Sequence, residues 1–135
     1  DAGLFPVARG GDGQQKRDVL RQAEELLVNG HVLAIFPEGS RSRSGTLQEG
    51  KGGAVILAIR AGVPILPMAI DGTERLHGVG WLFRRPRITV TIGPAFRLQS
   101  EGERLPRSEL SRLTTEIMRH IAQLLPLERR GPYAG

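Results

Sequence analysis

The chain has no cysteine, and it has one tryptophan and one tyrosine among its 135 residues. The absence of cysteine excludes disulfides, thiol catalysis and cysteine-based zinc sites. The shortage of aromatic rings argues against a surface that stacks nucleic-acid bases. No apolar run approaches the roughly 20 residues of a membrane-spanning helix, and no signal peptide is visible. The remaining composition, 39% hydrophobic and 24% charged, is that of an ordinary folded domain.

Basic residues outnumber acidic ones, and the formal net charge is +5. Such a surface favours anionic ligands, so phosphorylated metabolites, nucleic acid and anionic lipid headgroups are all compatible with it. The three histidines are His31, His77 and His120, which stand far apart without metal-ligand spacing. The sequence therefore predicts no metal site.

Strand and helix patterns alternate along the first half of the chain. Apolar runs bounded by turn residues predict strands over residues 4–7, 31–36 and 63–70. Apolar residues at helical spacing predict helices between them, after Asp12 and over residues 51–61. This order predicts an α/β fold with a largely parallel sheet flanked by helices. Ligands of such sheets bind beyond the carboxyl ends of the strands.

The second half of the chain is predicted to complete the same domain. Residues 87–92 alternate apolar and polar, which indicates a half-exposed strand at an edge. Residues 108–125 carry one apolar stripe at helical spacing, and Pro126 stops the helix. We expect a single domain over residues 1–127 and a tail over residues 128–135, which is ordered only if it docks.

The polar loop FPEGSRSRSGT, residues 36–46, is the most informative segment. Arg41 and Arg43 can bind a phosphate, and Gly39 lets the backbone come close to a ligand. Glu38 could orient an arginine or accept a hydrogen bond from a substrate hydroxyl. In a parallel sheet, Arg9 would lie at the same edge. The alternative is a solvated loop held by surface ion pairs.

Three other interpretations of this region are weaker. Residues 45–52 fit the phosphate-loop pattern GxxxxGK, but Gly52 stands where that motif needs a magnesium-binding Ser or Thr. Ser40 does not lie in the GxSxG setting of a nucleophile elbow. The Ser-Arg alternation is too short for a typical RNA-binding patch, so we predict no nucleic-acid partner.

Three motifs resemble those of the glycerolipid acyltransferases, the family of the lysophosphatidate acyltransferases. Residues 36–42, FPEGSRS, are similar to the family's FPEGTRS motif, with Ser40 in place of threonine. Residues 63–70, VPILPMAI, resemble its later VPIxPV-type motif. Residues 5–9, FPVAR, resemble its earlier motif that ends in arginine. Order and spacing agree from residue 1 to about Leu76.

The resemblance implies a glycerol-phosphate acyltransferase-like fold and an enzyme of phospholipid synthesis. Such an enzyme transfers a fatty acyl group from acyl-CoA or acyl-acyl carrier protein to lysophosphatidate or glycerol phosphate, with no bound cofactor. The main acceptor-binding residues that it implies are Arg9, Glu38, Gly39 and Arg41. The further binding residues are Ser40, Arg43 and Lys51. A peripheral position at the cytoplasmic face of a membrane is also implied.

The family's HxxxxD motif, whose His acts as general base, is absent from this chain. We therefore assign no catalytic residue and expect the chain alone to be inactive. The family places this motif before residue 1, and the chain opens without methionine, so we expect truncation at the N-terminus. The alternative is a non-catalytic module that binds phosphate or anionic lipid.

An apolar trio beside two arginines is the candidate for membrane contact. Trp81, Leu82 and Phe83 precede Arg84 and Arg85, a combination that suits a lipid interface. The alternative is that Trp81 and Phe83 pack in the core while the arginines face solvent.

Overall fold

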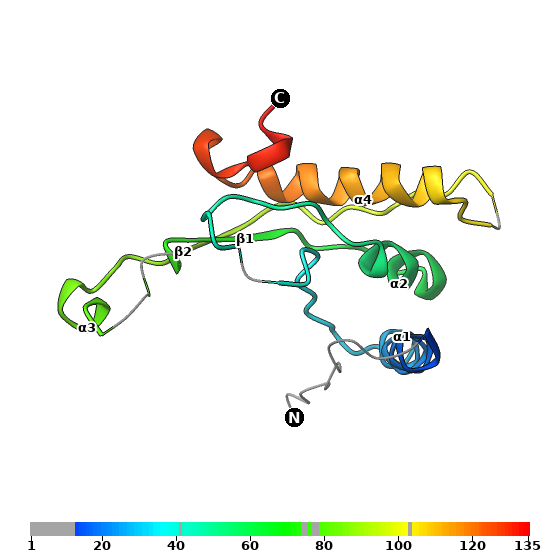
Figure 1. Cartoon of the computed structure of the whole chain (residues 1–135). Coiled ribbons are helices and arrows are strands. Elements are labelled where there is room, and N and C mark those ends of the chain that lie inside the picture. The colour runs from blue at the N-terminus through cyan, green and yellow to red at the C-terminus, as the bar shows by residue number, and fades with distance from the viewer. Residues whose placement is uncertain (1–12, 41, 74–75, 77–78, 103) are drawn as a thin grey trace.

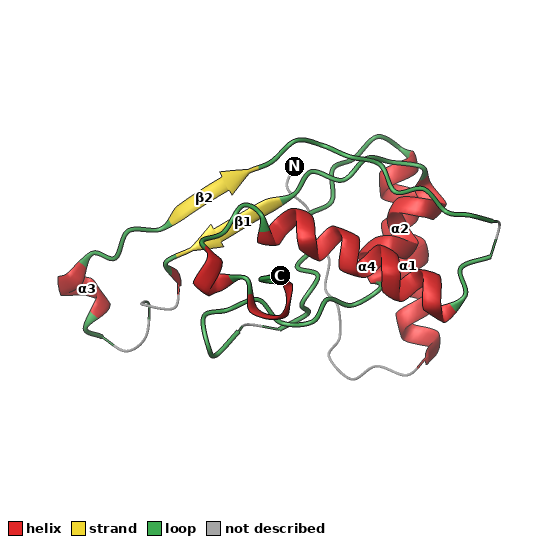
Figure 2. Cartoon of the chain, turned by 90° about the horizontal axis from the view of Figure 1, so that it is seen from above, coloured by secondary structure: helices red, strands yellow, loops and turns green. Residues whose placement is uncertain are grey.

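The computed structural model describes residues 13–40, 42–73, 76, 79–102 and 104–135, and the side chains of Trp81 and Arg84 are not described. Helices gather at one end of the molecule, and a β-hairpin extends from the other (Figures 1 and 2). Helix α1 (Gly13–Val28) packs on α2 (Gly53–Ala61), and α2 packs on α4 (Arg107–Ala122). Two short 3-10 turns, η2 (Leu127–Arg129) and η3 (Gly131–Tyr133), follow α4.

Glycine residues with positive φ end helices α1 and α2. Gly30 follows α1 with φ of 85°, and the N–H of His31 donates to Leu26 O at 3.0 Å, which closes that helix end. Gly62 follows α2 in the left-handed region, and its N–H donates to Ala58 O. Helices α2 and α4 confirm the predicted helices over residues 51–61 and 108–125, with ends shifted by up to three residues. Helix α4 ends before it reaches Pro126, the predicted stop. Asp12, the predicted N-cap of the first helix, lies outside the described residues.

The sheet in the described part of the chain is one antiparallel hairpin. Strand β1 (Met68–Asp71) pairs with β2 (Thr89–Ile92), with Met68 opposite Ile92 and Asp71 opposite Thr89. The short helix α3 (Trp81–Arg84) lies in the connection between them, at the far tip of the hairpin (Figure 1). The predicted strand over residues 87–92 is confirmed in its four last residues.

The core lies between α2, α4 and the segments that lead into the hairpin. Val55, Leu113 and Ile117 are buried at its centre. Ile65 and Phe96, which exchange two backbone hydrogen bonds of 2.8 and 2.9 Å, pack against it. The predicted stripe of the last helix therefore faces the core, because Leu113 and Ile117 belong to it.

The predicted parallel sheet is wrong for the described residues, because their only sheet is antiparallel and two-stranded. Residues 31–36 form no strand there, and none of them is buried: Val32 is 97% exposed and Phe36 75%. An apolar run becomes a buried strand only when neighbouring strands satisfy its backbone, and residues 31–36 have no such neighbour in the described part. The predicted strand over residues 4–7 lies outside the described residues.

The apolar face of the hairpin is exposed. Met68, Ile70, Val90 and Ile92 lie on one face through their cross-strand pairing, and each is 46–58% exposed. Ala69, on the opposite face of β1, is buried. The alternation in residues 87–92 correctly predicted a strand, but its apolar side chains are the ones that face solvent.

Candidate functional site

A turn at Gly39 shapes the loop that carries the candidate anion site. Gly39 has φ of 68°, a left-handed conformation that non-glycine residues rarely adopt. Its N–H donates to Phe36 O at 3.0 Å and closes a tight turn. The backbone N–H of Lys51 donates to Pro37 O at 2.8 Å, so the far end of the loop returns to its start. The described site residues Glu38, Gly39, Ser40, Arg43 and Lys51 thus lie within one closed loop.

The carboxylate of Glu38 connects the two ends of this loop by a further hydrogen bond. The backbone N–H of Gln48 donates to Glu38 Oε2 at 2.8 Å. The hydroxyl of Ser40 donates to Gln48 Oε1 at 3.5 Å. One oxygen of the predicted acceptor-site carboxylate therefore shapes the loop. The sequence pattern gave no signal for Gln48.

Lys51 lies directly over Gly39. A Cβ atom built on Gly39 would stand 3.0 Å from Lys51 Nζ and 3.1 Å from its Cδ. Glycine at position 39 therefore makes room for the lysine side chain as well as for the turn. Lys51 is exposed overall, and neither it nor Arg43 forms an ion pair with a carboxylate of the described residues. The site offers an ammonium group directly over the backbone turn.

The remaining loop residues add hydroxyl groups. Ser42 Oγ lies 3.1 Å from Ser44 Oγ, which lies 2.9 Å from Thr46 Oγ1. Arg43 stands between the two serines and is exposed. Arg9 and Arg41, two predicted phosphate ligands, lie outside the described residues. The loop is basic and rich in hydrogen-bond donors, which suits an anion.

The glycines of the GxxxxGK pattern do not form a phosphate cradle. The N–H of Leu47 donates to Arg129 O at 2.9 Å, and the N–H of Gly50 donates to the Tyr133 hydroxyl at 3.2 Å. A Cβ on Gly50 would overlap Met118 at 2.6 Å. The amides and open space that a phosphate loop needs are already occupied by protein groups, which supports the rejection of that motif.

The C-terminal turns supply residues that the sequence pattern did not suggest. Arg129 donates from Nη1 to Gly45 O at 3.2 Å, and its Nε lies 3.5 Å from Asp71 Oδ1. Tyr133 reaches Gly50 across 83 positions of sequence. No local periodicity or motif could reveal contacts between segments so far apart in the chain.

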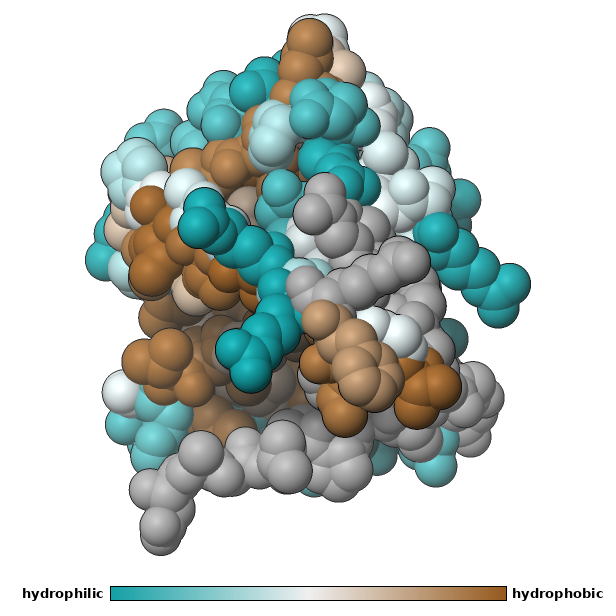
Figure 3. All heavy atoms as spheres, turned by 90° about the vertical axis from the view of Figure 1, so that its left-hand side faces the viewer, coloured by the Kyte–Doolittle hydropathy of each residue, from teal (hydrophilic) through white to brown (hydrophobic). Residues whose placement is uncertain are grey.

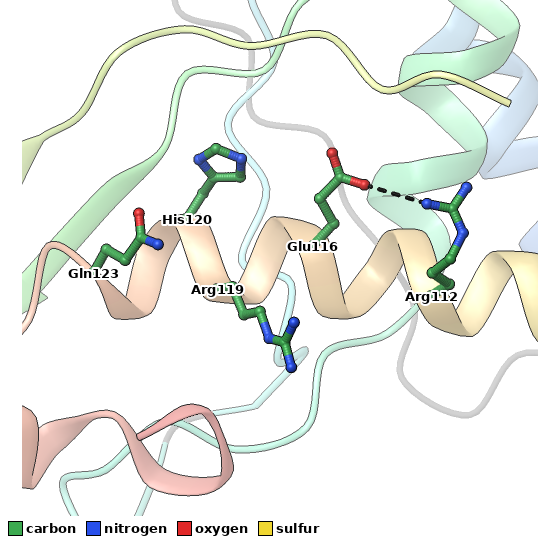
Figure 4. A pocket seen from close by; sticks show the side chains of 5 residues that line it. All are labelled: Arg112, Glu116, Arg119, His120 and Gln123. Carbon is green, nitrogen blue, oxygen red and sulfur yellow. Dashed lines mark ion pairs between the residues drawn. The ribbon is translucent and has the colours of Figure 1, made fainter. Parts of the chain in front are cut away.

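A shallow depression on α4 lies apart from this loop (Figure 4). Glu116 pairs with Arg112 at 3.8 Å, and His120 stacks on Phe96 with ring centroids 3.7 Å apart. Arg119 points away from both Glu116 and His120, so these side chains converge on no common point. No group of three His, Asp or Glu side chains within the described ranges could hold a metal ion.

The tip of the hairpin exposes apolar side chains. Leu82 is 61% exposed and Phe83 89%, so Phe83 does not pack in the core. Val79, just before α3, is 84% exposed. Hydrophobic side chains gather between long hydrophilic ones on the face that includes this tip (Figure 3). Within the described residues no helix is long and apolar enough to cross a membrane.

Comparisons with known proteins place the chain in a family. Residues 1–71 match the family model described as Acyltransferase. The 1-acyl-sn-glycerol-3-phosphate acyltransferase of Pseudomonas aeruginosa is 31% identical over 114 residues, which cover 84% of this chain and 44% of that protein. A chloroplastic enzyme of the same name from Brassica napus is 36% identical over 78 residues, which cover 58% of this chain and 22% of that protein.

A third relative, the enzyme of that name from Limnanthes douglasii, is 42% identical over 74 residues, 54% of this chain and 26% of that protein. No solved structure gives a significant match. The chain spans less than half the length of each of these three relatives.

The fold and the loop define an α/β protein with a candidate anion site. The matched residues include the whole turn at Gly39, the ammonium-bearing Lys51 and strand β1. The chain belongs to the acyltransferase family.

Proposed function

We propose that this chain is the acceptor-binding part of a 1-acylglycerol-3-phosphate acyltransferase. In that reaction the acceptor hydroxyl attacks the carbonyl carbon of an acyl thioester, the new ester forms, and the thiol leaves with the proton. The names of the relatives support the choice of acceptor. The donor would be acyl-CoA or acyl-acyl carrier protein.

The contact between Lys51 and Gly39 carries the proposal. The ammonium group lies 3.0 Å from the position of a Cβ on Gly39, where a phosphate that approaches the turn would meet the cation. Arg43 and the hydroxyl of Ser40 are exposed on the same loop and can add donors. Arg9 and Arg41 are proposed as further phosphate ligands on the strength of their motifs alone.

Glu38 has two proposed roles, which different substitutions separate. Its Oε2 accepts the N–H of Gln48 and shapes the loop, and the carboxylate could also accept a hydrogen bond from the acceptor hydroxyl. Glu38→Gln keeps an acceptor oxygen for Gln48 and removes the charge. Glu38→Ala removes both. We expect Glu38→Ala to weaken acceptor binding more than Glu38→Gln does.

We further propose that the tip of the hairpin touches the membrane that holds the acyl acceptor. Leu82 and Phe83 expose apolar side chains beside the exposed cation Arg85, an arrangement that suits an anionic lipid surface. Trp81 is included in this proposal because it immediately precedes Leu82 in the sequence. The protein would then sit peripherally at the cytoplasmic face of the membrane.

Glycerol 3-phosphate binding tests the acceptor site, because this ligand carries the phosphate without an acyl chain. Isothermal titration calorimetry should show that Lys51→Gln weakens binding by about 5- to 20-fold, the loss of one charge-assisted contact. Lys16→Gln is the matched control, since Lys16 is the chain's other lysine and lies exposed on α1. Equal affinities for Lys51→Gln and the unsubstituted protein would overturn the proposed site.

A further inference from the structure

The C-terminal turns lie against the segment that follows the Gly39 turn. We call residues 127–133 the C-terminal strap, and residues 45–50 the segment that it contacts. In Figure 1 the strap, coloured red, lies near the blue-green loop that passes under the end of α4. The strap carries no buried residue of its own in either 3-10 turn.

Three hydrogen bonds join the strap to the loop backbone. The guanidinium of Arg129 donates from Nη1 to Gly45 O at 3.2 Å, and the backbone carbonyl oxygen of Arg129 accepts the N–H of Leu47 at 2.9 Å. The Tyr133 hydroxyl accepts the N–H of Gly50 at 3.2 Å. Both side chains are partly shielded from solvent, which strengthens such bonds relative to exposed ones.

Two further features fix the strap in this position. Gly131 has φ of 54°, and the carbonyl oxygen of Leu47 occupies the place where a Cβ would stand, so a side chain at position 131 would separate the strap from the loop. Arg129 also pairs with Asp71 at the end of β1, where the two side chains are 22% and 34% exposed. One arginine thus ties the loop to the hairpin.

The bound loop residues lie beside those of the acceptor site. Leu47 and Gly50 flank Gln48, whose N–H holds Glu38, and Gly50 immediately precedes Lys51. If the strap were released, the amide of Gln48 and the backbone of Lys51 would lose their fixed neighbours. The turn at Gly39 and the ammonium group above it would then no longer be held in one geometry.

We propose that Arg129 and Tyr133 are positioning residues for acceptor binding, an inference that rests on the proposed function. They touch no substrate. They hold residues 45–50 so that Glu38 and Lys51 meet the acceptor phosphate and hydroxyl in a fixed arrangement. Pre-organisation of this kind lowers the acceptor KM, because the loop does not have to be ordered when the ligand binds.

Steady-state acyl transfer by the gene-length protein tests this role with three variants. Tyr133→Phe removes one hydroxyl, and Arg129→Gln removes the guanidinium. Arg130→Gln is the matched control, since Arg130 lies in the same strap and donates to Leu125 O rather than to the loop. The readouts are the KM for 1-acylglycerol 3-phosphate, the KM for the thioester, kcat, and hydrogen exchange of peptides that cover residues 45–50.

We expect the acceptor KM to rise about 3- to 10-fold in Tyr133→Phe, the effect of one lost hydrogen bond, and about 10-fold or more in Arg129→Gln. Hydrogen exchange over residues 45–50 should accelerate in both variants. The donor KM and kcat should stay within about twofold of the unsubstituted protein, as should every parameter of Arg130→Gln.

Different results would contradict the positioning role and the proposed function. Faster exchange with an unchanged acceptor KM, or a lower kcat with both KM values unchanged, would show that the strap serves stability alone and would overturn the positioning role. Unchanged exchange would overturn it as well. If the unsubstituted protein neither bound glycerol 3-phosphate nor transferred an acyl group, the proposed function would fail and the positioning role with it, whatever the exchange rates.

Discussion

Gly50 offers a direct test of how the loop is seated on helix α4. A Cβ atom at position 50 would lie 2.6 Å from Cγ and 2.8 Å from Sδ of Met118, and 3.0 Å from Cγ2 of Thr114. Non-bonded carbon atoms prefer separations near 3.5–4.0 Å, so something must move by about 1 Å. Met118 is fully buried and cannot turn toward solvent. The loop itself would have to retreat from α4.

The expected cost of Gly50→Ala follows from this overlap. Overpacking in a closed site destabilises by about 1–3 kcal/mol. A change of that size lowers the melting temperature by roughly 3–5 °C for each kcal/mol in a domain of this length. Urea unfolding followed by circular dichroism measures the free energy directly. The matched control is Gly53→Ala at the first residue of α2, where a Cβ meets nothing within 4 Å.

The control should be neutral or stabilising by up to about 1 kcal/mol, because alanine favours the helix and restricts the unfolded chain. A double-mutant cycle sharpens the comparison. Met118→Ala alone leaves a cavity, and Gly50→Ala in that background refills part of it, so the two costs should sum to more than the double variant shows. Gly50→Ala as stable as the unsubstituted protein, or strictly additive costs, would refute the reasoning.

Two further predictions concern the acceptor turn and the hairpin tip. Gly39→Ala should lower the free energy of unfolding by about 1 kcal/mol, because Gly39 has a left-handed φ of 68°. Calorimetry should show weaker glycerol 3-phosphate binding by this variant, because the new Cβ displaces Lys51. An unchanged affinity would show that Lys51 is not part of the acceptor site. Phe83→Ser should reduce co-sedimentation with anionic vesicles by about tenfold. Val28→Ser, at an exposed apolar position on α1, should leave it unchanged. Equal losses for both variants would reject a specific membrane contact.

Local signals predicted the helices well because helices depend on neighbouring residues. Gly62 stops α2 through its own backbone chemistry, and the apolar stripe that includes Leu113 predicts which face of α4 is buried. Helix α4, by contrast, ends at Ala122, four residues before the predicted stop at Pro126. Residues 31–36 show the opposite case. Their apolar pattern predicted a buried strand, but burial of a strand depends on partners that the pattern does not contain.

The candidate site, like the fold, was predicted from the sequence only in part. The motif predicted Glu38 and Gly39, Lys51 was named as a further binding residue outside the motif, and these three lie within one closed loop. The residues that hold the loop were missed, because Arg129 and Tyr133 act across more than 80 positions of sequence. A motif contains the residues proposed to bind a ligand, whereas the residues that hold them in place are determined by tertiary packing.

The most direct test of the central claim is acyl transfer from a thioester to 1-acylglycerol 3-phosphate by the gene-length protein and by its Lys51→Gln variant. We predict transfer by the unsubstituted protein, and in the variant an acceptor KM raised by about 5- to 20-fold with an unchanged donor KM. Glycerol 3-phosphate binding without any turnover would contradict the account. That result would instead indicate a non-catalytic module that binds phosphate or anionic lipid.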